Sequence, residues 1–78
     1  MAYLTQCIKG GSSYGHTGWL IKFDYDRQIL AELKRIHPSG REWDLDNKVW
    51  WISEVYDNEL NELFSNWYSL AKSQGTLL

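Results

Sequence analysis

The 78-residue sequence contains one proline, one cysteine and no long apolar run. A membrane-spanning helix needs about 18 or more apolar residues, so we expect no membrane partner. Cys7 has no second cysteine to pair with, and two histidines without further cysteines offer no zinc-site spacing. We therefore expect no internal disulfide, no metal and no cofactor. Residues 1–11 contain neither a basic start nor a long apolar stretch, which predicts a cytoplasmic protein rather than a secreted precursor.

The chain also lacks a large net charge, which is -2 at a sequence pI of about 5.5. The hydrophobic fraction of 44% is typical of a folded globule, and 78 residues suffice for one domain over 1–78. The acidic pI argues against a protein that coats nucleic acid non-specifically. Residues 1–41 nevertheless carry six basic and three acidic side chains, whereas the remainder carries two basic and seven acidic ones. This uneven distribution favours a local basic patch.

Aromatic residues are abundant, with five Trp, five Tyr and two Phe, and we expect most of them in the core. Apolar and polar side chains alternate from Trp19 to Asp26, which predicts a half-buried strand. A shorter strand is predicted over 3–9, and the glycine-rich segment 10–18 is typical of a flexible connection. The alternation over 41–46 and 48–53 predicts a second β-hairpin.

Each hairpin is followed by a segment with helical spacing of its apolar residues. Asp26 is the expected N-cap of a helix over 27–37, which Pro38 and Gly40 would end. Residues 56–71 keep the helical period and predict a second helix. The order ββαββα predicts an α+β domain with one antiparallel sheet and both helices packed on one face.

The alternation also assigns the two faces of this sheet. The residues expected to face the helices are Trp19, Ile21, Phe23, Trp43, Leu45, Trp50 and Ile52. The residues expected to point outward are Leu20, Lys22, Asp24, Glu42, Asp44, Val49 and Trp51. Trp51 is the unusual member of the outward set. Two interpretations remain open for it: an exposed ring, or a ring partly covered by the glycine-rich loop.

Residues 19–64 contain a set of motifs that resembles the HARP domain, a small module found in front of the motor of annealing helicases. The matching motifs are Phe23-x-Tyr25, Leu33-Lys34-x-Ile36 with a proline shortly after, Arg41-x-Trp43-Asp44 and Lys48-x-Trp50-x-Ile52. The sequence departs from the family pattern at His37, which separates Ile36 from Pro38. The resemblance implies a single HARP-like domain that contacts single-stranded or forked DNA during replication or repair. It also implies a helicase motor as a partner, which we expect to be a separate protein.

Four basic residues are expected to converge in this topology: Lys34, Arg35, Arg41 and Lys48. Phosphates bind such cations, and unpaired bases stack on exposed rings, a role that we assign to Tyr14 or Trp51. The predicted function is a small non-catalytic module that binds single-stranded or forked DNA. In the alternative interpretation Lys34 and Arg35 only complement a helix dipole, and Arg41 and Lys48 pair with Asp44 and Asp46.

A second hypothesis is a protein-interaction or self-association module that uses an apolar patch of Leu20, Val49 and Trp51. The oligomeric state remains open. Enzyme activity is not predicted, because the glycine-rich loop lacks the phosphate-binding pattern that ends in Gly-Lys-Ser/Thr. Its serines and His16 also lack an acid that would orient the imidazole.

Overall fold

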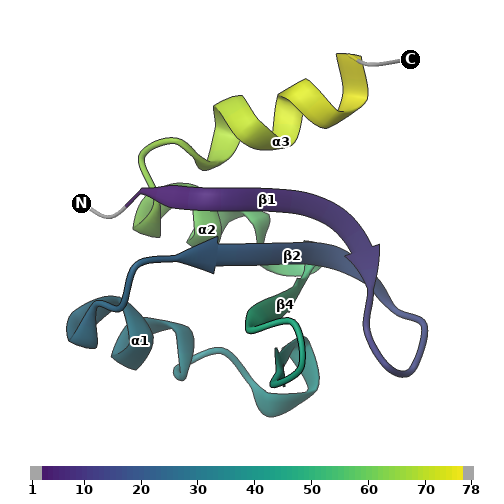
Figure 1. The fold of residues 1–78 in the computed structure, drawn as a ribbon, viewed down its shortest axis with the longest axis vertical. Coiled ribbons are helices and arrows are strands. Elements are labelled where there is room, and N and C mark those ends of the chain that lie inside the picture. The colour runs from purple at the N-terminus through teal and green to yellow at the C-terminus, as the bar shows by residue number, and fades with distance from the viewer. Residues whose placement is uncertain (1–2, 77–78) are drawn as a thin grey trace.

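The computed structural model describes residues 3–76 and contains one four-stranded antiparallel sheet with its helices packed against it (Figure 1). The elements in chain order are β1 (Leu4–Gly11), β2 (Thr17–Phe23), α1 (Arg27–Leu33), the 3₁₀ turn η1 (Pro38–Gly40), β3 (Arg41–Asp44), β4 (Val49–Ser53), the 3₁₀ turn η2 (Glu54–Tyr56), α2 (Asp57–Leu63) and α3 (Trp67–Thr76). The strand order is β1-β2-β4-β3. The α+β class and the single antiparallel sheet are confirmed.

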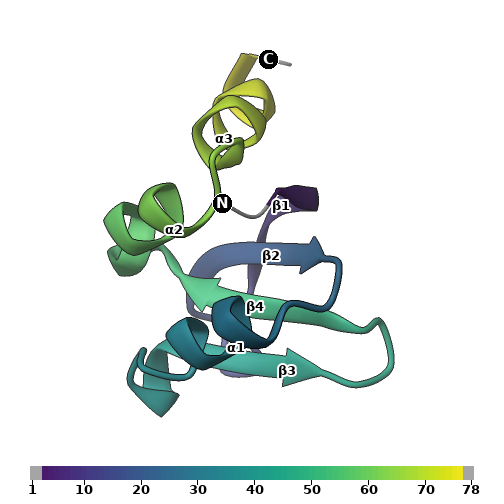
Figure 2. The ribbon, with the colours of Figure 1, turned by 90° about the vertical axis from the view of Figure 1, so that its left-hand side faces the viewer.

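The core lies between the inner face of the sheet and the helices. Trp19, Ile21 and Ile52 from the strands pack with Leu60 and Phe64 from the helical side. Figures 1 and 2 show α1 beside the β4 and β3 end of the sheet and α3 beside β1 at the opposite edge. The turn η1 also contacts β3 and β4.

The first helix is shorter than the predicted 27–37. Asp26 is its N-cap, as expected, because its carboxylate accepts hydrogen bonds from the Gln28 and Ile29 amides at 2.9 and 3.1 Å. The helix ends at Leu33, and the amides of Arg35 and Ile36 bond to carbonyls only three residues back, as in Ile36 N to Leu33 O at 3.0 Å. This tighter turn buries Ile36 before η1 begins.

The predicted single helix over 56–71 is wrong, because the chain forms two helices with a break at residues 64–66. Phe64 has extended backbone angles (φ -120°, ψ 117°). The side chain of Asn66 accepts a hydrogen bond from Leu4 N at 2.8 Å and donates one to Leu4 O at 2.9 Å. These two bonds direct α3 along the free edge of β1. Leu60, Phe64 and Trp67 keep helical spacing across the break, so periodicity alone conceals it.

Most of the residues predicted to face the helices do so, but Trp43 and Leu45 are exposed. Trp43 lies on β3, which is an edge strand, so no further strand covers its outer flank. Leu45 lies in the turn between β3 and β4 rather than in a strand. The pattern gives the face of a residue but not its distance from the edge of the sheet.

Trp51 and Val49 belong to the outward set, yet they are buried at 3% and 4% exposure. Gly10 and Gly18 pair across β1 and β2, which leaves room on the outer face for the Trp51 indole. A Cβ at Gly18 would lie 2.6 Å from Trp51 Nε1, and that nitrogen donates to Gly10 O at 3.2 Å. The expectation of an exposed Trp51 is wrong, and the alternative of a covered ring is correct.

Candidate functional site

A cleft lies between α1 and the end of the sheet formed by β2, β4 and β3. Its volume is about 440 Å³, within the range of sites for small ligands. We call it the lysine cleft, and its lining residues are Ile21, Lys22, Phe23, Tyr25, Leu30, Lys34, Trp43, Lys48 and Trp50. The wall is therefore aromatic and aliphatic, and every charged side chain that lines it is a lysine.

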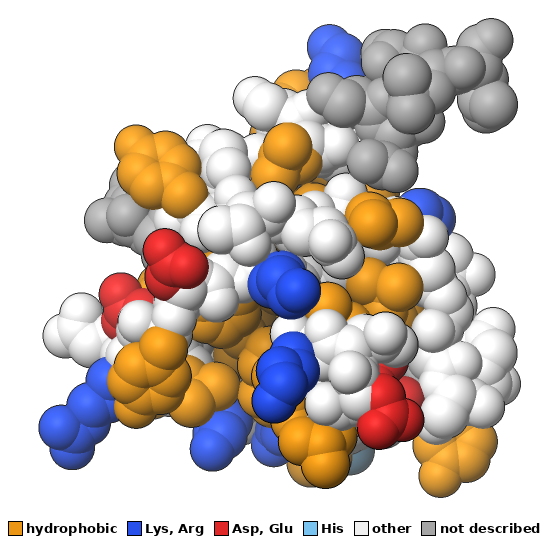
Figure 3. Space-filling model, in the orientation of Figure 1, with side chains coloured by type: hydrophobic (Ala, Val, Ile, Leu, Met, Phe, Trp, Pro, Cys, Tyr) orange, Lys and Arg blue, Asp and Glu red, His pale blue; other side chains and the backbone are white. Residues whose placement is uncertain are grey.

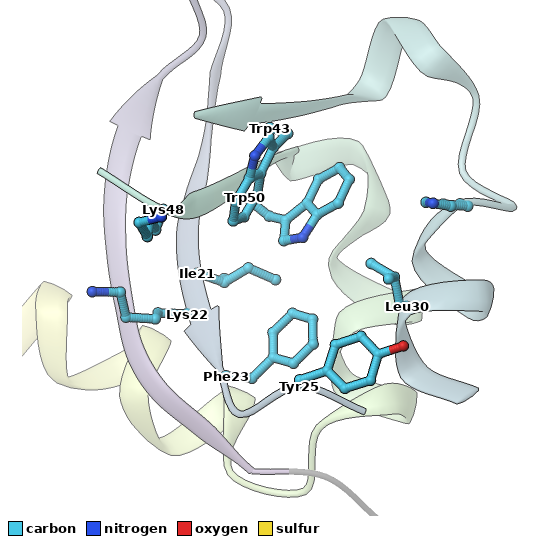
Figure 4. A pocket seen from close by; sticks show the side chains of 9 residues that line it. Ile21, Lys22, Phe23, Tyr25, Leu30, Trp43, Lys48 and Trp50 are labelled. Atoms are coloured by element: carbon cyan, nitrogen blue, oxygen red, sulfur yellow. The ribbon is translucent and has the colours of Figure 1, made fainter. Parts of the chain in front are cut away.

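The aromatic rings occupy two ends of the lysine cleft. Figure 4 shows Trp43 and Trp50 at one end, Phe23 and Tyr25 at the other, and Ile21 between them. Trp43 packs against Trp50 with ring centroids 5.3 Å apart and the planes inclined by 51°. Trp43 remains 47% exposed and Tyr25 80% exposed, so both rings have surface available for a ligand.

The three lysines come from different elements. Lys22 is on β2, Lys34 caps the end of α1, and Lys48 ends the turn before β4. Figure 3 shows basic side chains beside an apolar recess on this face of the molecule. Among the described side chains, none of the three ammonium groups forms an ion pair; the ion pairs present are Lys9–Glu54 and Arg35–Glu32.

Lys48 is positioned by an ordered turn. Asp44 Oδ1 accepts from the Asn47 amide at 3.1 Å, and Asp44 Oδ2 accepts from Asn47 Nδ2 at 2.9 Å. These side-chain and backbone hydrogen bonds lower the pKa of Asp44, which keeps its carboxylate ionised. Lys48 itself has φ 55°, and within residues 3–76 it is the one non-glycine residue with a positive φ. This conformation is uncommon for a side chain-bearing residue.

The structure brings together only two of the four basic residues predicted to converge. Lys34 and Lys48 line the lysine cleft, whereas Arg35 and Arg41 do not. Arg35 forms a 3.4 Å ion pair with Glu32 and lines a separate groove beside α2. Arg41 Nε donates to Ile36 O at 2.9 Å, which ties the entrance of the second hairpin to the end of α1. The alternative interpretation assigned Arg35 to the helix dipole, whereas in the structure its guanidinium pairs with Glu32.

The two rings proposed for base stacking are also outside the lysine cleft. Trp51 is buried and cannot present a face to a base. Tyr14 is 84% exposed, but it lines a groove on the outer face together with Glu42 and Asp44. Carboxylates at that position repel a phosphate chain.

The glycine-rich loop is held to the sheet rather than free. Ser13 donates to the Glu42 carboxylate from its amide at 3.1 Å and from its hydroxyl at 3.0 Å. Ser12 Oγ accepts from the amides of Tyr14 and His16. Both serine hydroxyls thus form hydrogen bonds that hold the loop in place. None of the described hydrogen bonds joins either serine to the His16 ring. Gly15 supplies the positive φ of 83° that this turn requires.

Sequence reasoning missed Lys22, Tyr25 and Trp43 as members of the site. Lys22 and Trp43 were assigned only to opposite faces of the sheet, and the strand order that brings them near one cleft was unknown. A usable signal was present, because Phe23, Tyr25, Trp43, Lys48 and Trp50 are all residues of the HARP-like motifs and all line the lysine cleft.

Two other candidate features contribute no site. Cys7 is buried, and desolvation followed by the charge of Asp57 raises the pKa of its thiol to about 11, so the thiol is neutral at ordinary pH. Within the described part of the chain, no group of three or more His, Cys, Asp or Glu side chains is arranged to hold a metal ion.

None of the helices over residues 3–76 has the length and apolar character that spanning a bilayer requires.

Comparisons of the chain with protein families, with curated proteins and with solved structures find no match.

Proposed function

We propose that this protein is a non-catalytic nucleic-acid-binding module that holds single-stranded or forked DNA at the lysine cleft. The observation that carries this proposal is the combination of three lysines without ionic partners and exposed aromatic rings in one cleft of an acidic protein. Ammonium groups left without carboxylates attract phosphates, and exposed rings offer stacking surfaces to unpaired bases.

The lysines and the rings have different roles in this proposal. Lys22, Lys34 and Lys48 anchor phosphates, which supplies affinity without reading sequence. Trp43 and Tyr25 stack on bases, which requires those bases to be unpaired. A continuous duplex keeps its bases stacked within the helix, so it can use only the phosphate contacts. Single strands and the junctions of forks provide both kinds of contact.

The HARP-like motifs support the same assignment, because they contribute rings at both ends of the lysine cleft and two of its three cations, Lys34 and Lys48. In this proposal a separate helicase motor is the partner that uses the bound strand during replication or repair. Cys7, a free buried thiol, is consistent with the reducing conditions of the cytoplasm, where we place the protein.

The test is fluorescence anisotropy of labelled single-stranded, forked and duplex DNA titrated with the protein at low salt. We expect tighter binding of single-stranded and forked DNA than of duplex. Lys34→Gln/Lys48→Gln should weaken single-strand binding by about tenfold, because it removes two phosphate contacts worth up to about 1 kcal/mol each.

The matched control is Arg35→Gln/Lys72→Gln, which removes the same charge from residues outside the lysine cleft. Its affinity should stay within about twofold of the parent protein. Equal losses in the two double variants would show that net charge alone drives binding. No binding of any DNA by the folded parent protein would refute the proposal.

The alternative interaction patch of Leu20, Val49 and Trp51 receives no support, because Val49 and Trp51 are buried. Only Leu20 retains partial exposure. This patch therefore offers too little apolar surface for a partner or for a second copy of the chain.

A further inference from the structure

The lysine cleft has aromatic rings at both ends. The indoles of Trp43 and Trp50 close one end, and Phe23 with Tyr25 closes the other (Figure 4). In this view Leu30 of α1 lies across the cleft from Ile21, Lys48 lies near the two indoles, and the Lys22 side chain extends from β2 in the direction opposite to Ile21 and Phe23. Such a cleft can enclose one flat ring, whereas a strand-binding groove has open ends along which successive bases can follow.

The surface beyond Trp43 gives a second reason for a short site. Trp43 also borders the groove on the outer face, and the charged side chains that line this groove are Glu42 and Asp44. The hydrogen bonds from Asn47 keep Asp44 ionised, and Glu42 is fixed by Ser13. A phosphate chain that continued past Trp43 toward Tyr14 would meet these carboxylates, so Tyr14 cannot serve as the next stacking platform.

The arrangement of the cations gives a third reason for a short site. Lys34 follows α1, whereas Lys22 and Lys48 belong to the sheet side of the cleft. With cations on both walls and rings at both ends, phosphates can be held at the mouth while the base between them enters the cleft.

We propose that the lysine cleft is a pocket for one unpaired nucleobase, with the flanking phosphates held by Lys22, Lys34 and Lys48. This inference rests on the proposed function and specifies which part of the DNA the cleft binds. That part is one base stacked on Trp43 rather than a strand that follows a groove. The Trp43 ring packs against Trp50, with centroids 5.3 Å apart, so the stacking surface is held in place before the base arrives. The number of nucleotides contacted is therefore smaller than the roughly 4–16 that an OB-fold groove contacts.

The test uses three labelled strands of about 12 nucleotides, a length within the usual range for single-strand sites. One is oligothymidylate, one consists of abasic residues throughout, and one is abasic except for a single central thymidine. We expect the single thymidine to restore most of the affinity of oligothymidylate and to quench tryptophan fluorescence. The all-abasic strand should bind about 5- to 150-fold more weakly, the range expected for loss of one stacked base.

Two variants identify the ring that accepts the base. Trp43→Ala should abolish the difference between the single-thymidine and all-abasic strands. Trp43→Phe, which keeps a ring, should retain part of that difference. Tyr14→Ala is the control, and it should leave the difference unchanged because Tyr14 lies in the outer groove.

The outcomes separate this inference from the proposed function. Equal affinity for oligothymidylate and the all-abasic strand would leave phosphate anchoring intact and overturn the base pocket. Affinity that rises with every added thymidine would also overturn it, in favour of a groove that follows the strand. Failure to bind any of the strands would overturn both proposals.

Discussion

Lys48 has a backbone conformation that glycine would adopt at lower cost. Its φ of 55° lies in the left-handed region, where a residue with a Cβ costs about 1–2 kcal/mol more than glycine. The turn is stabilised by the hydrogen bonds between Asp44 and Asn47, so it does not depend on the Lys48 side chain. Backbone strain of this kind occurs often at functional sites, and here it places an ammonium group at the lysine cleft.

Lys48→Gly should therefore separate stability from binding. We expect the free energy of unfolding to rise by up to about 1 kcal/mol, because relief of the positive φ exceeds the entropic cost of glycine in the unfolded chain. Affinity for single-stranded DNA should fall, because one cation is lost. Urea unfolding followed by tryptophan fluorescence measures the first effect, and DNA titration measures the second.

Lys48→Gln is the matched control for that experiment. It removes the charge and keeps the Cβ, so its stability should match the parent protein and its affinity should match Lys48→Gly. If Lys48→Gly is the less stable of the two, the turn depends on the lysine side chain and the strain argument fails.

Trp51 shows which residue-level properties the sequence could not supply. Alternation placed it correctly on the outer face, because a strand fixes the direction of every second side chain. Its burial depends on Gly10 and Gly18, which become neighbours only when β1 pairs with β2. A contact between residues 41 positions apart, such as Trp51 with Gly10, leaves no local signal in the sequence.

At the level of elements, the least expected feature is the join between α2 and α3. Asn66 uses its side-chain amide as a β-strand uses its backbone, with one donated and one accepted hydrogen bond at Leu4. This pairing satisfies part of the free edge of β1 and fixes the direction in which α3 leaves. Helical periodicity predicted the apolar face of both helices correctly, but it carries no information on this contact.

Asn66→Ala should destabilise the protein by about 1–3 kcal/mol, since it removes two partly buried hydrogen bonds that each contribute about 0.5–1.5 kcal/mol. The Leu4 amide should then exchange its hydrogen faster than in the parent protein. Urea unfolding and hydrogen exchange measure these two effects. Asn66→Asp keeps the hydrogen-bond acceptor and loses the donor. Its free energy of unfolding should lie between those of Asn66→Ala and the parent protein.

Asn61→Ala is the control for a general effect of removing an asparagine. Asn61 is exposed on α2, and alanine favours a helix at such a position, so stability should stay equal or rise slightly. DNA affinity should be unchanged in the Asn66 variants, because the α2–α3 join lies outside the lysine cleft. A loss of stability in Asn61→Ala equal to that of Asn66→Ala would contradict the assigned role of Asn66.

For the molecule as a whole, periodicity predicted the class of the fold better than the location of the site. The single antiparallel sheet followed from this pattern, and so did the order of the elements up to the break between α2 and α3. The site required the strand order β1-β2-β4-β3, which brings β2 next to β4 and so places Lys22 and Lys48 at one cleft. The predicted clustering of basic residues was right for Lys34 and Lys48 and wrong for Arg35 and Arg41, whose partners are Glu32 and Ile36.

The charge of the whole molecule sets how DNA binding should depend on salt. The net charge is -2, so the proposed function requires a local attraction at the lysine cleft rather than one from the protein as a whole. Three lysines that each neutralise a single-strand phosphate predict that log Kobs falls with log salt with a slope of about -2, at roughly 0.7 per contact.

Each of Lys22→Gln, Lys34→Gln and Lys48→Gln should make the slope less steep by about 0.7. Lys72→Gln, outside the lysine cleft, should leave the slope unchanged. The measurement is a titration series between about 50 and 200 mM salt. A much steeper slope in the parent protein would mean that the phosphate contacts extend beyond these three lysines, since each additional contact adds its own released counterion.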